Sequence, residues 1–234
     1  MTVPATSSSI ARVTGRVLTR HAPTVAVLAL VAFVPLLLTA LRLPAPSGLA
    51  PAKAMVRTTL GLVVATVPCV LLLVGGVAPL ARAVVAGTPL PLFAALRAGL
   101  GGLARAVVPC LLACAAILIG TLALVVPGLL LLGLFALTGA STAAGLPASL
   151  DDSAAIVRAH RRSVALVMIA WLGVVGLALL ALYLRLPLPL PKKPLATTLS
   201  EFRTFARTAV LIAITAGPVV ATALAAIHAR ADRR

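Results

Sequence analysis

Residues 122–145, LALVVPGLLLLGLFALTGASTAAG, constrain the architecture of the chain more than any other segment. This stretch is apolar over almost its whole length, yet Pro127 and Gly128 interrupt it. The wider run over residues 106–150 contains no Asp, Glu, Lys or Arg. As one helix, these roughly 45 residues would be about 67 Å long, more than twice the ~30 Å hydrocarbon core of a bilayer. The run must therefore fold back on itself.

Pro127 and Gly128 predict where the run folds back. Pro127 lacks the amide hydrogen that a continuing helix needs, and its ring disfavours helical geometry at Val126. Gly128 adopts the positive φ of a tight turn without the steric cost that a side chain adds. We therefore expect a hairpin turn at Pro127 and Gly128, at one membrane face. The alternative is a kink in one continuous helix.

The composition of the chain is that of a membrane protein with several spans. Hydrophobic residues make up 62% and charged residues 10%, against roughly 25% charged residues in an ordinary soluble domain. Lys and Arg number 20 against 4 Asp and Glu, which gives a net charge of +16. These basic residues are scattered beside apolar segments and form no single patch, so we expect anionic lipid as their partner and not nucleic acid.

Six spans are expected, because a helix needs roughly 20 apolar residues to cross the bilayer core. The predicted spans are residues 24–41, 59–80, 106–126, 128–146, 164–184 and 208–227. The first has no clear cleavage motif after it, so we interpret it as an uncleaved span. The expected fold is an all-α polytopic membrane protein. Its parts are an N-terminal amphipathic cytoplasmic segment at 1–23, a six-span membrane domain at 24–228 and a basic C-terminal tail at 229–234.

Short amphipathic helices are expected on the membrane surface outside these spans. Residues 7–22 place apolar residues and arginines on separate faces of a helix. Two more such helices are expected at 91–107 and 147–163, and in the latter Ser149 and Asp152 fit a capping box. Prolines in residues 187–194 favour an extended connector before a further short helix that begins near Thr198.

The distribution of Lys and Arg predicts the orientation. In the six-span arrangement, more of them lie on the side that holds both termini, which the positive-inside rule places in the cytoplasm. One basic cluster opposes this orientation because it falls on the other side. Its members are Arg185, Lys192, Lys193, Arg203 and Arg207.

One family resemblance covers residues 87–176. It is carried by an amphipathic helix, then VVPG at 125–128, LLLLGLFAL at 129–137 and ASLDDSAAIVRAHRRSVALVM at 148–168. This layout resembles the membrane domain attached to some bacterial glycerophosphodiester phosphodiesterases, and a wider group of uncharacterised six-span membrane proteins. The resemblance implies a module of the bacterial cytoplasmic (inner) membrane. It does not imply a phosphodiesterase, because no segment supplies the metal-binding residues of the catalytic barrel.

The polar segment after the predicted fourth span carries a basic cluster. Arg158, His160, Arg161 and Arg162 lie within five residues at the end of the expected helix. Guanidinium groups bind phosphate well, so these four residues are candidates for contact with an anionic lipid headgroup. The alternative is a positive-inside anchor without a specific ligand.

Small residues at 138–145 allow two interpretations. Helix packing would use Gly139, Ser141, Ala143 and Gly145, because small side chains let helices approach closely. An intramembrane serine protease would use Ser141 with His228, but the second glycine of the usual Gly-x-Ser-Gly motif and an oxyanion-binding His and Asn pair are missing. We therefore expect helix packing and assign no catalytic residue.

No cofactor or metal is expected, because the three cysteines lie in apolar runs without acidic or histidine partners. The function favoured by the sequence is a non-catalytic membrane protein that organises lipid or a partner protein, including a second copy of itself. The alternative is a transporter for an apolar or lipid-like solute, since glycines and prolines interrupt the spans while ionisable residues are absent from them. An intramembrane serine protease is the remote alternative.

Overall fold

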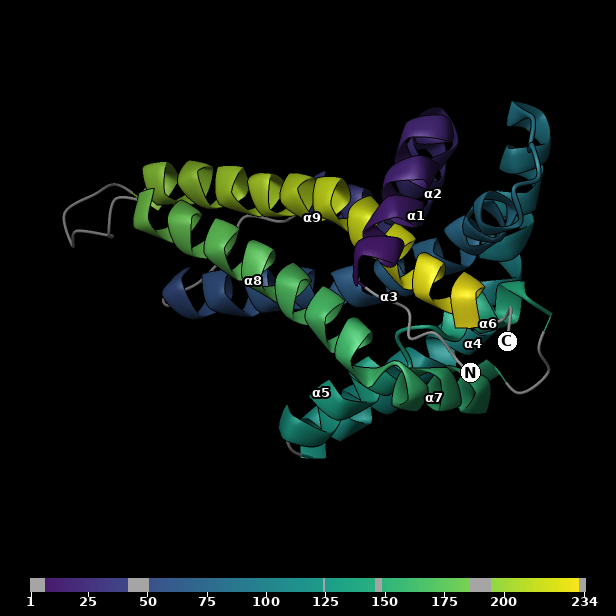
Figure 1. Cartoon of the computed structure of the whole chain (residues 1–234). Helices are drawn as coiled ribbons and strands as arrows, with labels where there is room; N and C mark the ends of the chain where they lie inside the picture. Colours follow the sequence, from purple (N-terminus) through teal and green to yellow (C-terminus); the bar gives the residue numbers. More distant parts are fainter. Residues whose placement is uncertain (1–6, 42–50, 124, 146–148, 186–194, 232–234) are drawn as a thin grey trace.

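The computed structural model describes residues 7–41, 51–123, 125–145, 149–185 and 195–231, and it is helical in all of these segments. The prediction of an all-α protein is confirmed. Figure 1 shows the helices. They are α1 (Ser7–Arg20), α2 (Ala22–Leu41), α3 (Pro51–Ala86), α4 (Leu92–Ala123), α5 (Val125–Leu134), α6 (Thr138–Ala143), α7 (Ser149–Ala159), α8 (Arg161–Arg185) and α9 (Leu195–Ala231).

Helix α3 lies at the centre of the molecule. It packs against α1, α2, α4, α6 and α9, and its apolar side chains between Cys69 and Ala81 are almost all buried. Helix α9 runs beside α3 in the same direction and also packs along α8 (Figure 1). The main core therefore forms between α3 and α9, where Leu73, Val77 and Leu224 are fully enclosed.

Glycines let α4 and α6 approach α3 closely. A Cβ atom at Gly75 of α3 would lie 2.6 Å from the Cβ of Ala106 and 3.3 Å from the carbonyl oxygen of Gly102, both in α4. A Cβ atom at Gly139 of α6 would overlap the carbonyl oxygen of Leu71 and lie 2.8 Å from the backbone nitrogen of Gly75. The two neighbours thus meet the backbone of α3 at one level, a contact that only small residues permit.

The chain folds back between α4 and α5, as the length of the apolar run demands. Helix α5 packs on α4, and a Cβ atom at Gly120 would lie 3.3 Å from the backbone of Gly128 and 2.7 Å from the side chain of Leu131. The position of the turn was predicted wrongly, however. Pro127 and Gly128 both lie within the first turn of α5, where proline is tolerated because its missing amide would have no partner.

Gly128 therefore contributes close packing and not a turn conformation. Among the described glycines only Gly87 and Gly145 have a positive φ. A Cβ atom at Gly128 would overlap the side chain of Thr121 in α4. Glycine is needed here so that the first turn of α5 can lie directly on α4.

The predicted fourth span, residues 128–146, is broken after Leu134. Helix α6 begins at Thr138, and Ser153 of α7 satisfies backbone groups at the break. The Ser153 hydroxyl donates a hydrogen bond to the carbonyl oxygen of Leu134 at 2.8 Å and accepts one from the amide of Leu137 at 3.2 Å. Because Ser153 is fully buried, no water replaces these bonds.

Two short surface helices expected from the sequence are parts of longer helices instead. Helix α4 runs from Leu92 into the predicted third span and on to Ala123 without interruption, and one buried stripe crosses the expected boundary. The stripe consists of Ala95, Gly99, Gly102, Ala106 and Cys110. Helix α9 likewise joins the short helix expected near Thr198 to the sixth span, since residues 195–216 contain neither glycine nor proline. The connector expected at 187–194 lies outside the described residues.

Three helical stretches within the described residues are long and apolar enough to cross a membrane. They are Ala65–Ala86, Leu92–Thr121 and Ile214–Ala231. A fourth is obtained when α1 and α2, which meet at 90°, are taken together. The stretch Gly128–Ala143 is apolar but too short to qualify. The described chain thus has the apolar helices of a membrane protein, with three or four candidate spans.

The close approach of α6 to α3 gives a direct test. We expect Gly139→Ala to destabilise the protein by about 1–3 kcal/mol, because the added methyl group overlaps the backbone of α3. Gly133→Ala in α5 is the matched control: a Cβ atom there meets no described residue within 4 Å, and alanine favours the helix. Thermal unfolding in detergent, followed by circular dichroism, measures both. Equal unfolding temperatures for the two variants would contradict the observed packing.

The bond network at the helix break gives a second test. We expect Ser153→Ala to cost about 1–3 kcal/mol, since it leaves the buried backbone groups of Leu134 and Leu137 without partners. Ser163→Ala, at a half-buried serine of α8, is the control and should change the unfolding temperature little. If Ser153→Ala were as stable as Ser163→Ala, Ser153 would not support the break.

Candidate functional site

The junction between α7 and α8 carries the basic cluster predicted from the sequence. Val157 and Val164, two helical turns apart, are buried on either side of it. The amide of His160 donates to the carbonyl oxygen of Ile156 at 2.9 Å, and the amide of Val164 donates to that of His160 at 3.1 Å. The backbone therefore stays hydrogen-bonded through the junction, and the two buried valines fix it against the protein.

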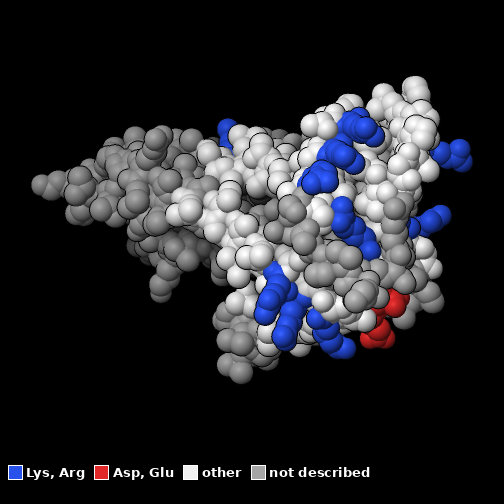
Figure 2. Space-filling view, in the orientation of Figure 1, with Lys and Arg blue, Asp and Glu red and all other residues white. Residues whose placement is uncertain are grey.

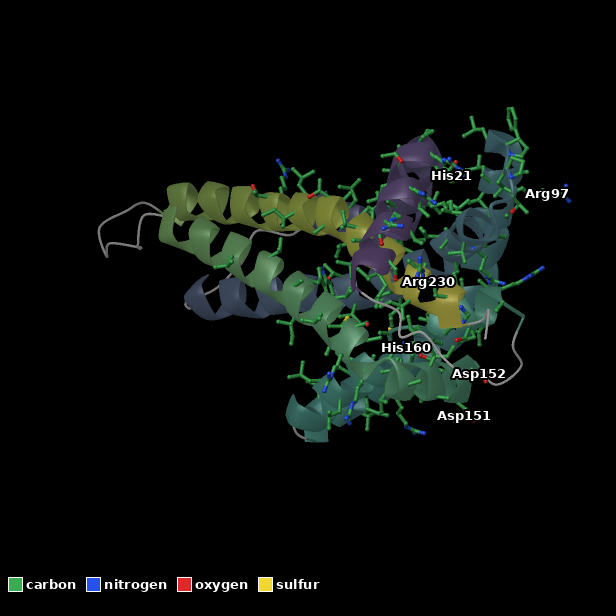
Figure 3. All side chains as sticks on the ribbon, in the orientation of Figure 1. His21, Arg97, Asp151, Asp152, His160 and Arg230 are labelled. Atoms are coloured by element: carbon green, nitrogen blue, oxygen red, sulfur yellow. The ribbon has the colours of Figure 1, made fainter. Side chains whose placement is uncertain are left out.

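The charged groups of this cluster face outward. Arg158, Arg161 and Arg162 are exposed, and His160 is half-buried. Asp151 and Asp152 lie at the other end of α7, as Figure 3 shows. This arrangement suits the helix dipole, which favours acidic groups at the first turn and basic groups at the last. It also leaves the arginine end of α7 strongly positive.

The arginines at the junction belong to a wider positive face. Figure 2 shows Lys and Arg side chains in a band that runs from α1 past the end of α9 to the α7–α8 junction. Arg230, near the end of α9, is half-buried. In Figure 3 it lies between His21, at the end of α1, and His160, at the α7–α8 junction. Three segments far apart in the sequence thus present positive charge on one side of the molecule.

The small residues at 138–145 lie in different environments. Gly139 contacts α3, Ser141 is fully buried and Ala143 packs against the main core. Gly145 is different: it is exposed, no atom of the described residues lies within 4 Å of where its Cβ would be, and its φ is +80°. Gly145 therefore follows α6 in a left-handed conformation, and its assignment to helix packing was wrong.

The serine protease interpretation needs Ser141 to be activated by His228. Both residues are fully buried. Within the described part of the chain, the Ser141 hydroxyl has no hydrogen-bond partner. A nucleophilic serine requires a base within hydrogen-bond reach. His228 therefore does not activate Ser141 in this structure.

Other candidate centres lie in apolar surroundings. Cys69 and Cys110 are buried and Cys114 is half-buried, and the described residues contain no group of three His, Cys, Asp or Glu side chains placed to hold a metal ion. A small pocket between α3, α5, α8 and α9 is lined by apolar side chains, among them Met168 and Trp171. The pocket offers packing surface and no cluster of polar groups.

The structural role of Ser153 was missed by the sequence reasoning. Its position gave one usable signal, because Ser153 lies beside Ala154 and one turn before Val157, on the apolar side of α7. A small polar residue on a buried face must find a hydrogen-bond partner. The partner itself lies 16 to 19 residues away, so only the folded structure reveals it.

Comparison with known proteins finds no family, curated protein or solved structure that matches this chain.

The two buried serines should respond to alanine in opposite ways. Ser141→Ala removes a buried hydroxyl that has no hydrogen-bond partner among the described residues, so we expect unchanged or higher stability, whereas Ser153→Ala should destabilise the protein. Thermal unfolding of the two purified variants, side by side, measures the difference. A large loss of stability in Ser141→Ala would mean that its hydroxyl forms a bond that this structure lacks.

Proposed function

We propose that this protein is a non-catalytic, multi-span membrane protein that binds anionic phospholipid at its positive face and so organises lipid or a partner protein around it. The observation that carries the proposal is the fixed α7–α8 junction with Arg158, Arg161 and Arg162 exposed on it. Arginine binds phosphate oxygens through paired, charge-assisted hydrogen bonds.

The apolar surface of the protein supports a lipid environment. Large hydrophobic side chains are exposed along α2, α4 and α8, for example Val108 at 65%, Ile119 at 67% and Leu177 at 68%. Surfaces of this kind in water would promote association, but they suit contact with acyl chains. A second copy of the chain or another membrane protein would bind on the same faces.

We further propose six spans, of which the broken segment α5–α6 would be the fourth, with both termini and α7 on the cytoplasmic side of a bacterial cytoplasmic membrane. The positive band of Figure 2 supports it, because α1, the end of α9 and the α7–α8 junction share one face. Basic residues are enriched on the cytoplasmic side of membrane proteins. All three segments are assigned to this side by the positive-inside rule.

Lipid retention tests the proposed function. We expect purified protein in a neutral detergent to bind phosphatidylglycerol more tightly than phosphatidylcholine, as measured by native mass spectrometry. Replacing Arg158, Arg161 and Arg162 by Gln should lower the affinity for phosphatidylglycerol by up to about 100-fold, since each charge contributes about 1 kcal/mol at an anionic surface.

The control variant removes positive charge from α4, away from the α7–α8 junction. Arg97→Gln with Arg105→Gln changes two exposed arginines of α4 and should leave phosphatidylglycerol binding close to that of the unchanged protein. If the unchanged protein bound both lipids equally, or if the control lost as much affinity as the triple variant, a lipid site at the α7–α8 junction would be excluded.

Cysteine labelling in intact cells tests the arrangement in the membrane. Ser153 is a poor position for a label because it is fully buried, but Ala155 on α7 is exposed. In a cysteine-free variant, we expect a membrane-impermeant maleimide to label single cysteines at Ser47 and Ser200 but not at Ala155. Labelling at Ala155 would place α7 outside the cell and overturn the proposed orientation.

A further inference from the structure

The apolar face of helix α1 packs against other helices of the same chain. Ile10, Val13 and Val17 are buried, with Val17 at 0% exposure, and α1 packs on α9 and α3. The sequence predicted instead that this face would lie on the membrane surface. An amphipathic helix has one apolar face, and here α9 and α3 cover it. Insertion of that face into lipid therefore does not explain what α1 does.

The opposite face of α1 is a row of arginines. Arg12, Arg16 and Arg20 are all exposed and follow one another at intervals of four residues. The row is about 12 Å long, because each residue adds 1.5 Å to a helix. Partial burial lowers the pKa of His21, at the end of the row, and the charge of Arg20 lowers it further. The positive charge of this face near neutral pH therefore comes from the arginines.

The angle between α1 and α2 sets the depth of this row in a membrane. The two helices meet at 90°. Helix α2 exposes a line of large apolar residues, including Leu30, Val34 and Leu38, which suits contact with acyl chains. If α2 runs along the bilayer normal, α1 lies parallel to the membrane plane, and its three arginines lie at a single depth beyond the apolar part of α2. That depth is the level of the lipid headgroups.

We infer that α1 is an electrostatic binding element for anionic phospholipid, in which Arg12, Arg16 and Arg20 bind headgroup phosphates while the apolar face stays docked on α9 and α3. The inference rests on the proposed function and extends its lipid site from the α7–α8 junction across the positive band of Figure 2 to α1. The apolar line on the adjoining α2 favours lipid over nucleic acid or an acidic protein, because neither of these has acyl chains to cover it.

This mode of binding differs measurably from insertion. Binding by an inserted helix depends on the apolar area that enters the membrane. Binding by exposed arginines depends on charge and weakens as salt screens it. Charge removal on α1 should therefore reduce lipid binding with little change in the stability of the protein, because Arg12, Arg16 and Arg20 are exposed.

The test uses the full chain in neutral detergent and dilute phosphatidylglycerol, with native mass spectrometry as the readout. We expect the variant with Arg12, Arg16 and Arg20 replaced by Gln to bind phosphatidylglycerol up to about 100-fold more weakly at low salt, as for the three arginines of the α7–α8 junction. The difference should shrink at high salt, and replacement of the same three residues by Lys should preserve binding. The Arg97→Gln and Arg105→Gln variant is the control, and circular dichroism verifies that each variant is folded.

The outcomes separate this inference from the proposed function. If the α1 Gln variant keeps full affinity while the Arg158, Arg161 and Arg162 variant loses it, the inference is wrong and the proposed function stands. If the unchanged protein does not prefer phosphatidylglycerol to phosphatidylcholine, both fail. If the α1 Gln variant loses binding to a single-stranded oligonucleotide but not to phosphatidylglycerol, α1 is a nucleic-acid element and the inference is again wrong.

Discussion

Helices α4 and α6 both meet the backbone of α3 at Gly75, and this close contact organises the helices around it. Gly102 and Gly139 face this point from the two neighbouring helices, and a methyl group at any of the three positions would overlap a backbone atom or a side chain in the neighbouring helix. In lipid the hydrophobic effect does not drive helices together, because acyl chains are as apolar as the helices. Van der Waals contact between closely packed small residues therefore supplies much of the attraction. The position of α6 against the central helix follows from this contact.

The packing of α6 on α3 is connected to the basic cluster at the α7–α8 junction by the buried hydroxyl group of Ser153. Helix α6 is too short to stand alone, and the break between Leu134 and Thr138 leaves backbone groups that apolar surroundings cannot satisfy. Ser153 bonds to both sides of the break and thereby joins α7 to it. Because α7 is held at this point and at Val157, the arginines that follow it have a defined position on the surface. The packing of Gly139 on α3 therefore helps to fix the position of Arg158 on the surface.

The surface of the molecule has apolar regions and a positively charged region. Exposed apolar residues run along α2, α4 and α8, while arginines gather over α1, the end of α9 and the α7–α8 junction (Figure 2). A protein at a lipid interface needs both surfaces, because the apolar one contacts acyl chains and the arginines contact headgroups. The apolar faces therefore support the proposed lipid binding by the arginines of the α7–α8 junction.

Features that depend on length and local periodicity could be predicted from the amino-acid sequence. The uncharged run at 106–150 is too long for one span and does fold back, the arginines of α1 do take the opposite face from Val13 and Val17, and α7 forms within the segment 147–163 where a short helix was expected. The tertiary structure decided what these local rules leave open. Proline fits the first turn of a helix as well as a reverse turn, so the sequence leaves both open. In the folded chain Pro127 and Gly128 lie in the first turn of α5, and Gly128 packs against Thr121. Periodicity gives a helix an apolar face but not its partner, so only the folded chain shows that α9 and α3 cover α1.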